Sequence, residues 1–222
     1  MTVPGEYTTP TDDMRAVHTA LRSSLAAAPA LVAGAGTDPA KVAVAASYCD
    51  NVLEFLHVHH EGEDELIYPV LEERCAQHKE LLERIDAQHT LLVEPMTAAR
   101  GAVAAWQGAP SATSGRGVVD TFATVSDLLA PHLAEEEDEV LPIASSYLAP
   151  EEWAELPGHA LRSFGGDKPW LALGLVFEQL PPEVRDQVLA GMPPPLQQLW
   201  TNDWQPAFTG FMSEVQSIAG PS

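Results

Sequence analysis

Two segments of the chain repeat one pattern of histidine, glutamate and proline. The first reads HHEGEDELIYP from His59, and the second reads HLAEEEDEVLP from His132. In each segment a glutamate follows the histidine by four residues, and a proline follows it by ten. Four residues of α-helix make about one turn and rise about 6 Å, so the two side chains leave the same helix face. The pattern therefore requires helix in both segments and predicts that each pair can hold one ion.

Apolar residues elsewhere in the first 150 residues recur at helical spacing, with almost no strand-like alternation, which indicates an all-α fold. Asp38 followed by Pro39 is typical of a helix start. Proline, glycine and capping residues divide the region into four long helices, at about 11–29, 38–75, 79–106 and 118–147. GAGTDPA is predicted as a loop and GAPSATSGRG as a flexible connection. Short connections favour antiparallel neighbours, so we expect an up-down-up-down four-helix bundle.

The composition changes after Pro150. Residues 151–222 hold four of the five tryptophans and frequent prolines, which predict shorter helices broken by turns. We therefore expect two parts: residues 1–150 as a bundle that contains the site, and residues 151–222 as a C-terminal helical extension whose aromatic side chains pack on the bundle. The alternative is that these aromatic residues form a surface for a partner or for a homodimer.

The first repeat leaves the choice of histidine open, because His57 and His59 each have a glutamate four residues later. Alignment of the prolines of the two repeats resolves it. His59 then falls on His132, whereas His57 falls on Ala130. We therefore predict that His59 faces the interior together with Glu63, and that His57 is partly exposed or supports a ligand from outside.

The other two long helices each carry one histidine, His18 or His89, on an apolar stripe. A single histidine on such a stripe is more often a core residue than a metal ligand. Here, however, two glutamates and four histidines would share one interior, where a buried carboxylate is costly without a compensating charge. A bound dication supplies that charge, and carboxylate with imidazole suits iron and its neighbours. The predicted metal ligands are His18, His59, Glu63, His89, His132 and Glu136, with His60 as a candidate additional ligand that borders the same face.

Six ligands on four helices, with two carboxylates able to bridge, favour two metal ions over one. Such ions would keep open positions for a small molecule. The remaining acids are expected to be solvated, with one of them orienting a ligand histidine. These acids are Glu61, Asp64, Glu65, Glu135, Glu137, Asp138 and Glu139.

The charge of the chain limits its partners. Eleven Lys and Arg stand against 32 Asp and Glu, a formal net charge of −21, which repels nucleic acid and anionic membrane surfaces. No apolar stretch approaches the roughly 20 residues that span a bilayer, and the first residues lack the order of a signal peptide. A cytoplasmic protein is therefore expected. Cys49 and Cys75 have no CxxC spacing and are predicted to be reduced thiols without a role.

One histidine, a His-x-x-x-Glu pair, one more histidine and a second such pair follow in order along the four helices: His18, His59 with Glu63, His89, and His132 with Glu136. This order resembles the hemerythrin-like, or HHE cation-binding, family over about residues 11–148. The resemblance implies a four-helix bundle around a non-heme, carboxylate-bridged di-iron centre.

The chain departs from the oxygen-carrying hemerythrins in two places. Those proteins have a second histidine on the third helix, where this chain offers only His89, and they end in an aspartate one residue later than Glu136. The pattern is instead similar to the branch associated with iron sensing, peroxide or nitric oxide response, and iron handling. His60 sits where some relatives place another ligand.

The sequence thus predicts a non-heme di-iron protein that binds or reacts with dioxygen, peroxide or nitric oxide. A sensing or iron-handling module without turnover is one alternative, and a helical scaffold that binds zinc is another.

Overall fold

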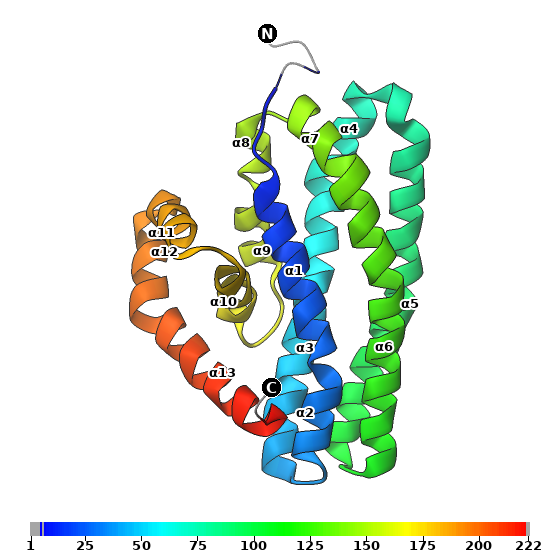
Figure 1. Ribbon diagram of the computed structural model, residues 1–222, viewed down its shortest axis with the longest axis vertical. Helices are drawn as coiled ribbons and strands as arrows, with labels where there is room; N and C mark the ends of the chain where they lie inside the picture. Colours follow the sequence, from blue (N-terminus) through cyan, green and yellow to red (C-terminus); the bar gives the residue numbers. More distant parts are fainter. Residues whose placement is uncertain (1–4, 6, 221–222) are drawn as a thin grey trace.

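The computed structural model describes residue 5 and residues 7–220, and the regular elements of these residues are all helical (Figure 1). The bundle contains α1 (Asp12–Ala26), α2 (Ala28–Ala35), α3 (Pro39–Gly62), α4 (Tyr68–Arg74), α5 (Lys79–Gly108), α6 (Ala112–Glu135) and α7 (Leu141–Tyr147). The extension contains α8 (Pro150–Trp153), α9 (Leu156–Ser163), α10 (Pro169–Gln179), α11 (Pro182–Gly191), α12 (Pro194–Leu199) and α13 (Gln205–Ala219).

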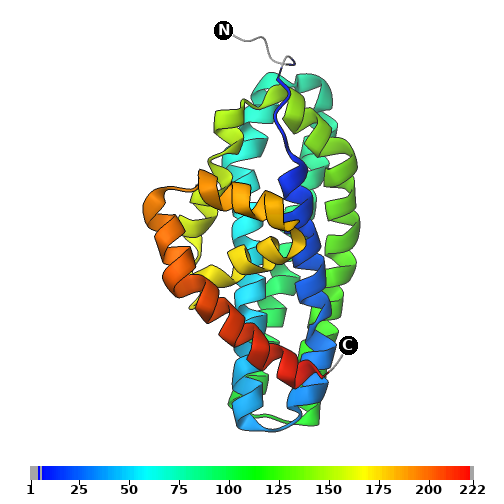
Figure 2. The ribbon, with the colours of Figure 1, turned by 60° about the vertical axis from the view of Figure 1, so that its left-hand side comes forward.

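Four rods run side by side and form the bundle: α1 with α2, α3 with α4, α5, and α6 with α7 (Figures 1 and 2). Helix α5 packs along both α3 and α6, and α1 packs against α3 and α6, so each rod has two neighbours. The arrangement confirms the predicted all-α bundle with further helices after it.

Helix boundaries follow local capping chemistry. The side chain of Asp38 accepts from the backbone N–H of Ala40 at 2.9 Å, and Pro39 occupies the first turn of α3, as predicted. Helix α1 ends at Ala26, three residues before the predicted end near Pro29. The unpredicted element is α2, which has this proline in its first turn and continues the rod to Ala35.

The expected flexible connection at GAPSATSGRG is also wrong over most of its length. Helix α6 begins at Ala112, because Ser111 and Ser114 form a capping box in which each side chain accepts from the other's backbone N–H at 3.1 Å. The connection therefore closes within two or three residues.

The extension lies along the face of the bundle formed by α1, α2 and α3 (Figure 2). Helix α10 packs on α1 and α3, α9 packs on α3, and α13 packs on α2 and α3. Leu171, Leu175 and Phe208 of the extension join the main apolar core of the bundle. Trp170 and Trp200 pack mainly edge-to-face against phenylalanine rings of the extension itself, for example Phe177 against Trp200 with ring centroids 4.9 Å apart.

The apolar interior forms two separate clusters, and the histidines lie between them. On α1, His18 stands between Met14 of one cluster and Leu21 of the other. On α5, His89 stands between Ile85 and Leu92 in the same way. A polar layer therefore crosses the bundle and divides its core. Within the part of the chain that the structure describes, no helix is both long and apolar enough to cross a membrane.

Candidate metal centre

All seven predicted ligand residues converge in this polar layer. His18 comes from α1, His59 and His60 from the end of α3, His89 from α5, and His132 from the end of α6. Glu63 and Glu136 each open a five-residue π-helical turn, η1 (Glu63–Ile67) and η3 (Glu136–Val140). Each of the seven residues is no more than 7% exposed.

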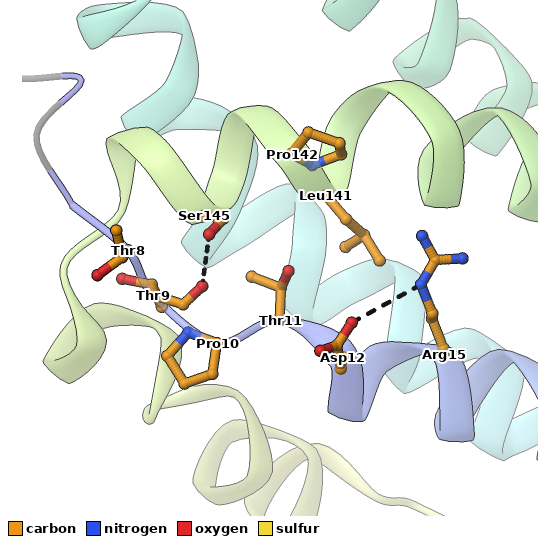
Figure 3. A pocket seen from close by; sticks show the side chains of 9 residues that line it. All are labelled: Thr8, Thr9, Pro10, Thr11, Asp12, Arg15, Leu141, Pro142 and Ser145. Atoms are coloured by element: carbon orange, nitrogen blue, oxygen red, sulfur yellow. Dashed lines mark hydrogen bonds and ion pairs between the residues drawn. The ribbon is translucent and has the colours of Figure 1, made fainter.

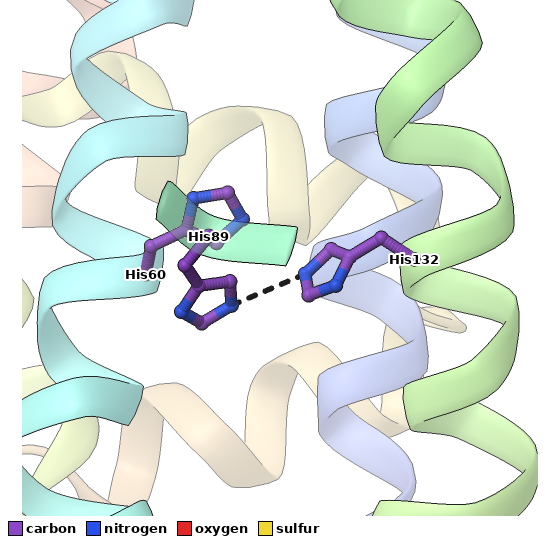
Figure 4. A group of neighbouring side chains, drawn as sticks. All are labelled: His60, His89 and His132. Atoms are coloured by element: carbon purple, nitrogen blue, oxygen red, sulfur yellow. Dashed lines mark hydrogen bonds between the residues drawn. The ribbon is translucent and has the colours of Figure 1, made fainter. Parts of the chain in front are cut away.

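The side chains form two groups whose ligand atoms lie within 4.8 Å of one another: His60, His89 and His132 in one, and His18, His59, Glu63 and Glu136 in the other. Figure 4 shows the three-histidine group, with the rings of α3, α5 and α6 turned toward one another. The Nε2 atoms of His89 and His132 are 3.2 Å apart, and the His60 ring stacks on His89 with centroids 4.2 Å apart. The grouping fits a metal site; that these residues bind metal stays a prediction.

The two carboxylates lie between the groups. Glu63 Oε2 is 3.5 Å from Nε2 of His59 and 3.7 Å from Nε2 of His89, which belong to different groups. Glu136 Oε2 is 3.6 Å from Nε2 of His18 and 3.4 Å from Nε2 of His132. Most of these separations are long for hydrogen bonds, whereas two donors each about 2.1 Å from one ion lie roughly 3.0–3.5 Å apart. The spacing therefore suits ligand atoms that share a cation.

Several polar atoms of the layer are buried without a hydrogen-bond partner among the described residues. They are Nε2 of His18, His59 and His60, and Oε2 of Glu63 and Glu136. Buried polar atoms nearly always have partners, and a cluster of such atoms without partners would destabilise a bundle. The five atoms face the same interior region, which is where a bound cation would satisfy them.

The outer nitrogens of three histidines are held by partners from other helices. Nδ1 of His18 is 3.0 Å from Glu137, and Nδ1 of His89 is 2.7 Å from Asp64. Nδ1 of His132 is 2.9 Å from Oε1 of Gln88. These oxygens accept, so Nδ1 donates and Nε2 is directed inward for a cation. We expected one acid to orient a ligand histidine; two do so, together with an amide.

Glu137 is itself held by two arginines of α1. Arg22 donates to its Oε1 at 2.7 Å, and Arg15 donates to its Oε2 at 3.0 Å. Burial acts to raise the pKa of Glu137, but the hydrogen bonds from Arg22 and His18 outweigh it and lower that pKa. The carboxylate therefore stays ionised beside His18.

Tyr68 is a site residue that sequence reasoning missed. This buried phenol donates a hydrogen bond to Oε1 of Glu136, on the opposite repeat. Burial, followed by the charges of Glu136 and Glu63, holds the pKa of Tyr68 well above its ordinary value, so the group is a hydrogen-bond donor. The available signal was the alignment of the repeats, in which Tyr68 falls on the apolar Leu141.

Burial and neighbouring charges shift the pKa values of the histidines in the layer in opposite directions. Burial lowers the pKa of His59 and His60 well below normal and that of His132 to about 4. For His89 burial also acts downward, but Asp64 and Glu136 outweigh it and raise the pKa to about 9.

The pKa values of the two glutamates also shift in opposite directions. Burial and the neighbouring Glu136 raise the pKa of Glu63 well above normal. Burial acts to raise that of Glu136 too, but His89 and the other histidines lower it to about 2. Protons on Glu63 and His89 thus balance part of the charge of the metal-free layer.

Both of these π turns carry a candidate ligand glutamate at the first position and precede a proline by two residues. The N–H of Tyr68 bonds to the carbonyl of Glu63, and that of Leu141 to the carbonyl of Glu136, five residues back. A proline in an α-helix clashes with the carbonyl four residues earlier, and a wider turn relieves that clash. Proline alone is not sufficient, because Pro95 and Pro131 lie inside α-helices.

Two further predictions concern His57 and the two cysteines. His57 is exposed, while His59 is buried in the layer. The structure therefore turns His59 inward, as the alignment of the two repeats predicts. Cys49 and Cys75 are free and buried, and burial raises the pKa of Cys49 to about 12. A thiol with so high a pKa is inert near neutral pH.

A polar depression of about 320 Å³ lies outside the layer, between the segment before α1, the first turn of α1, and α7 (Figure 3). Its lining residues are Thr8, Thr9, Pro10, Thr11, Asp12, Arg15, Leu141, Pro142 and Ser145. The hydroxyl of Ser145 donates to the Thr9 carbonyl at 2.7 Å and closes one side. This described lining contains none of the seven candidate ligands, so the depression is separate from the metal centre.

Comparison with protein families finds a match over more than half of the chain. The family model described as the Hemerythrin HHE cation binding domain matches residues 9–144, which contain all seven candidate ligands. Searches of curated proteins and of solved structures returned no match.

Proposed function

Because this chain belongs to the hemerythrin HHE cation-binding domain family, we propose that its polar layer holds two iron ions and that this centre binds or reduces a small oxidant, either dioxygen, peroxide or nitric oxide. The cation-binding character follows from the family; the metal, the number of ions and the reactivity are our proposal.

One observation carries the proposal. Seven buried ligand side chains fall into a group of four and a group of three, and each glutamate lies within 3.8 Å of histidines from both groups. This is the arrangement in which carboxylates bridge two cations. Four and three protein donors also leave positions for a small molecule on a six-coordinate ion.

Iron held in this layer would supply a reversible change of oxidation state and open coordination positions. The surrounding residues of the chain would orient the ligands and exclude water. Asp64, Gln88 and Glu137 orient histidines from outside, and Tyr68 fixes one oxygen of Glu136. The apolar clusters on both sides of the layer exclude bulk water.

A zinc-binding scaffold is the second candidate, and the three-histidine group favours it. Three histidines with an open fourth position are a common zinc ligand set. Zinc in that group would leave the carboxylate group for a different ion or for protons.

Metal analysis of protein purified aerobically without added metal tests the proposal. We expect iron at about two ions per chain, and near-ultraviolet and visible absorption typical of a ferric pair. Zinc in place of iron, or a colourless protein with full metal content, would contradict it.

Anaerobic titration of the reduced protein with peroxide then separates reactivity from sensing. Repeated turnover with iron retained supports oxidant reduction. Stoichiometric bleaching or loss of iron supports a sensing role instead. The Glu139→Ala variant, which changes an exposed acid of the second repeat, is the matched control.

A further inference from the structure

Helix α9 of the extension lies directly against the backbone of α3 next to η1, where the regular helix gives way to the π turn that begins with Glu63. The contact is made at Gly62. A Cβ atom at that position would lie 3.3 Å from Cδ2 of His159 and 3.4 Å from Cδ2 of Leu156. The first distance is shorter than an ordinary side-chain contact and the second is at its lower limit, so a side chain at this position would press against α9.

Comparison of the two repeats shows that this glycine is specific to the first. The residue that corresponds to Gly62 in the second repeat is Glu135, which lies at the surface and bonds to Arg84 and Gln88. Glycine inside a helix is less favourable than a residue with a side chain, and it is used where another part of the molecule must come close. At this position the first repeat is covered by the extension, whereas the second carries the half-buried Glu135, held by Arg84 and Gln88 of α5.

His159 is the central residue of this contact and is 7% exposed. Its Nε2 lies 3.5 Å from a carboxylate oxygen of Glu61, and its Nδ1 lies 3.7 Å from one of Glu65. The ring thus touches residues on both sides of Glu63: the two before it and one two positions after it.

Both ends of the segment that carries α9 are tied to the bundle. Before α9, the indole N–H of Trp153 donates to Asp13 of α1 at 3.1 Å. After α9, the N–H of Gly165 donates to Glu54 of α3 at 2.8 Å. Helix α9 therefore has little freedom to move away from the π turn.

We infer that the extension controls the metal centre through His159, whose ring fixes the position of the turn that carries Glu63. His159 is a positioning residue: it does not face the ligands, and it acts through the backbone on which Glu63 stands. The coupling is reciprocal, so a cation bound by Glu63 stabilises the docked position of α9. This inference rests on the proposed metal binding.

Titration of the metal-free full chain with ferrous iron under argon, followed by the absorption spectrum after oxidation, tests it. His159→Ala removes the ring. Gly62→Ala adds a methyl group on α3 that presses against the ring. We expect each variant to bind iron roughly tenfold more weakly, the lower end of the effect of residues that support metal ligands, and to shift the ferric absorption. His159→Phe, which keeps a flat ring against Gly62, should restore both.

Asp167→Ala is the matched control. Asp167 accepts a hydrogen bond at 2.6 Å from Asn51 of α3, another contact between the extension and this helix, twelve residues before Glu63 and about 18 Å away along the axis. It should lower Tm but leave iron affinity and spectrum unchanged.

If His159→Ala and Gly62→Ala resemble Asp167→Ala, or if His159→Phe loses as much affinity as His159→Ala, the inference is wrong. A wild-type chain that binds no iron would instead reject the proposed function.

Discussion

The two His-x-x-x-Glu repeats have the same backbone and different surroundings. Both pass from α-helix into a five-residue π turn at the ligand glutamate and return to α-helix just before a proline. Around the first repeat, α9 covers Gly62 and the neighbouring Tyr68 reaches across to the other glutamate. Around the second, Glu137 is held by two arginines of α1, and the half-buried Glu135 is held by Arg84 and Gln88 of α5. The repeated sequence sets the direction of the ligands, and residues outside it set the environment of each.

The largest expected effect comes from removal of either carboxylate. Glu136 contacts three histidines of the layer and Glu63 contacts two, so Glu136→Ala should lose more metal than Glu63→Ala. In both variants the rise in Tm on addition of iron should nearly disappear, because the binding free energy adds to the stability of the fold. Calorimetry with and without iron, together with metal analysis, measures this. Equal losses would mean that the two repeats contribute equally.

A fall in pH from 7 to 5 should weaken metal binding next most strongly. The proton on His89, whose pKa is about 9, must leave when a cation binds, and burial favours a proton on Glu63 as well, so we expect proton release on binding near pH 7. Titration calorimetry in two buffers of different ionisation enthalpy counts these protons. Binding without proton release would show that the metal-free layer is already fully deprotonated.

The stability of the metal-free chain should depend on pH with opposite signs for two histidines. The folded-state pKa of His132 is about 4, below the unfolded value of about 6.5, so its contribution is lost as the pH falls below about 6.5. The folded-state pKa of His89 is about 9, so its contribution is present below about 6.5 and lost as the pH rises toward 9. Denaturant titrations of wild type and His89→Gln across this range separate the two.

Tyr68→Phe should have an intermediate effect. The variant keeps the ring but leaves Oε1 of Glu136 without its donor, so metal affinity should fall roughly tenfold, as for other residues that support metal ligands. Tyr147→Phe is the matched control, because its hydroxyl accepts from Gln77 at the surface, far from the layer. Iron titration of the two variants compares their affinities. An unchanged affinity for Tyr68→Phe would show that Tyr68 does not support the metal centre.

The smallest effect is expected at His57. This residue is exposed, so His57→Ala should change the free energy of unfolding by less than about 0.5 kcal/mol and leave the metal content unchanged. His59→Ala, two residues away, should lose metal. Similar losses from both variants would mean that the first repeat binds metal in the other register.

The convergence of the seven candidate ligands could be predicted from sequence because it depends on local geometry. Spacing of four places His59 with Glu63 on one helix face, and the repeat identifies the face. The apolar stripes around His18 and His89 turn them inward. These inferences need only the helical period and the burial of apolar residues.

The partners of the ligands could not be predicted, because they depend on how the rods are rotated against each other. Asp64 and Glu137 lie in acid runs that also contain solvated residues, and nothing local distinguishes them. Gln88 reaches His132 from a different helix. The start of α6 differs from the prediction for another reason: serines and glycines are typical of flexible segments, whereas Ser111 and Ser114 cap a helix here.

The π turn before Tyr68 has one more consequence. A wide turn accommodates one residue more than an α-helical turn, so deletion of a single residue from Glu63–Ile67 would let the segment relax into continuous α-helix. Such a deletion would leave the downstream segment in place, because the π turn already absorbs the extra residue. If all five residues instead formed α-helix, everything downstream would rotate by roughly 100°, and the phenol would swing off the opposite repeat. The width of this turn, in addition to the identity of its residues, is thus part of what brings the two halves of the centre together.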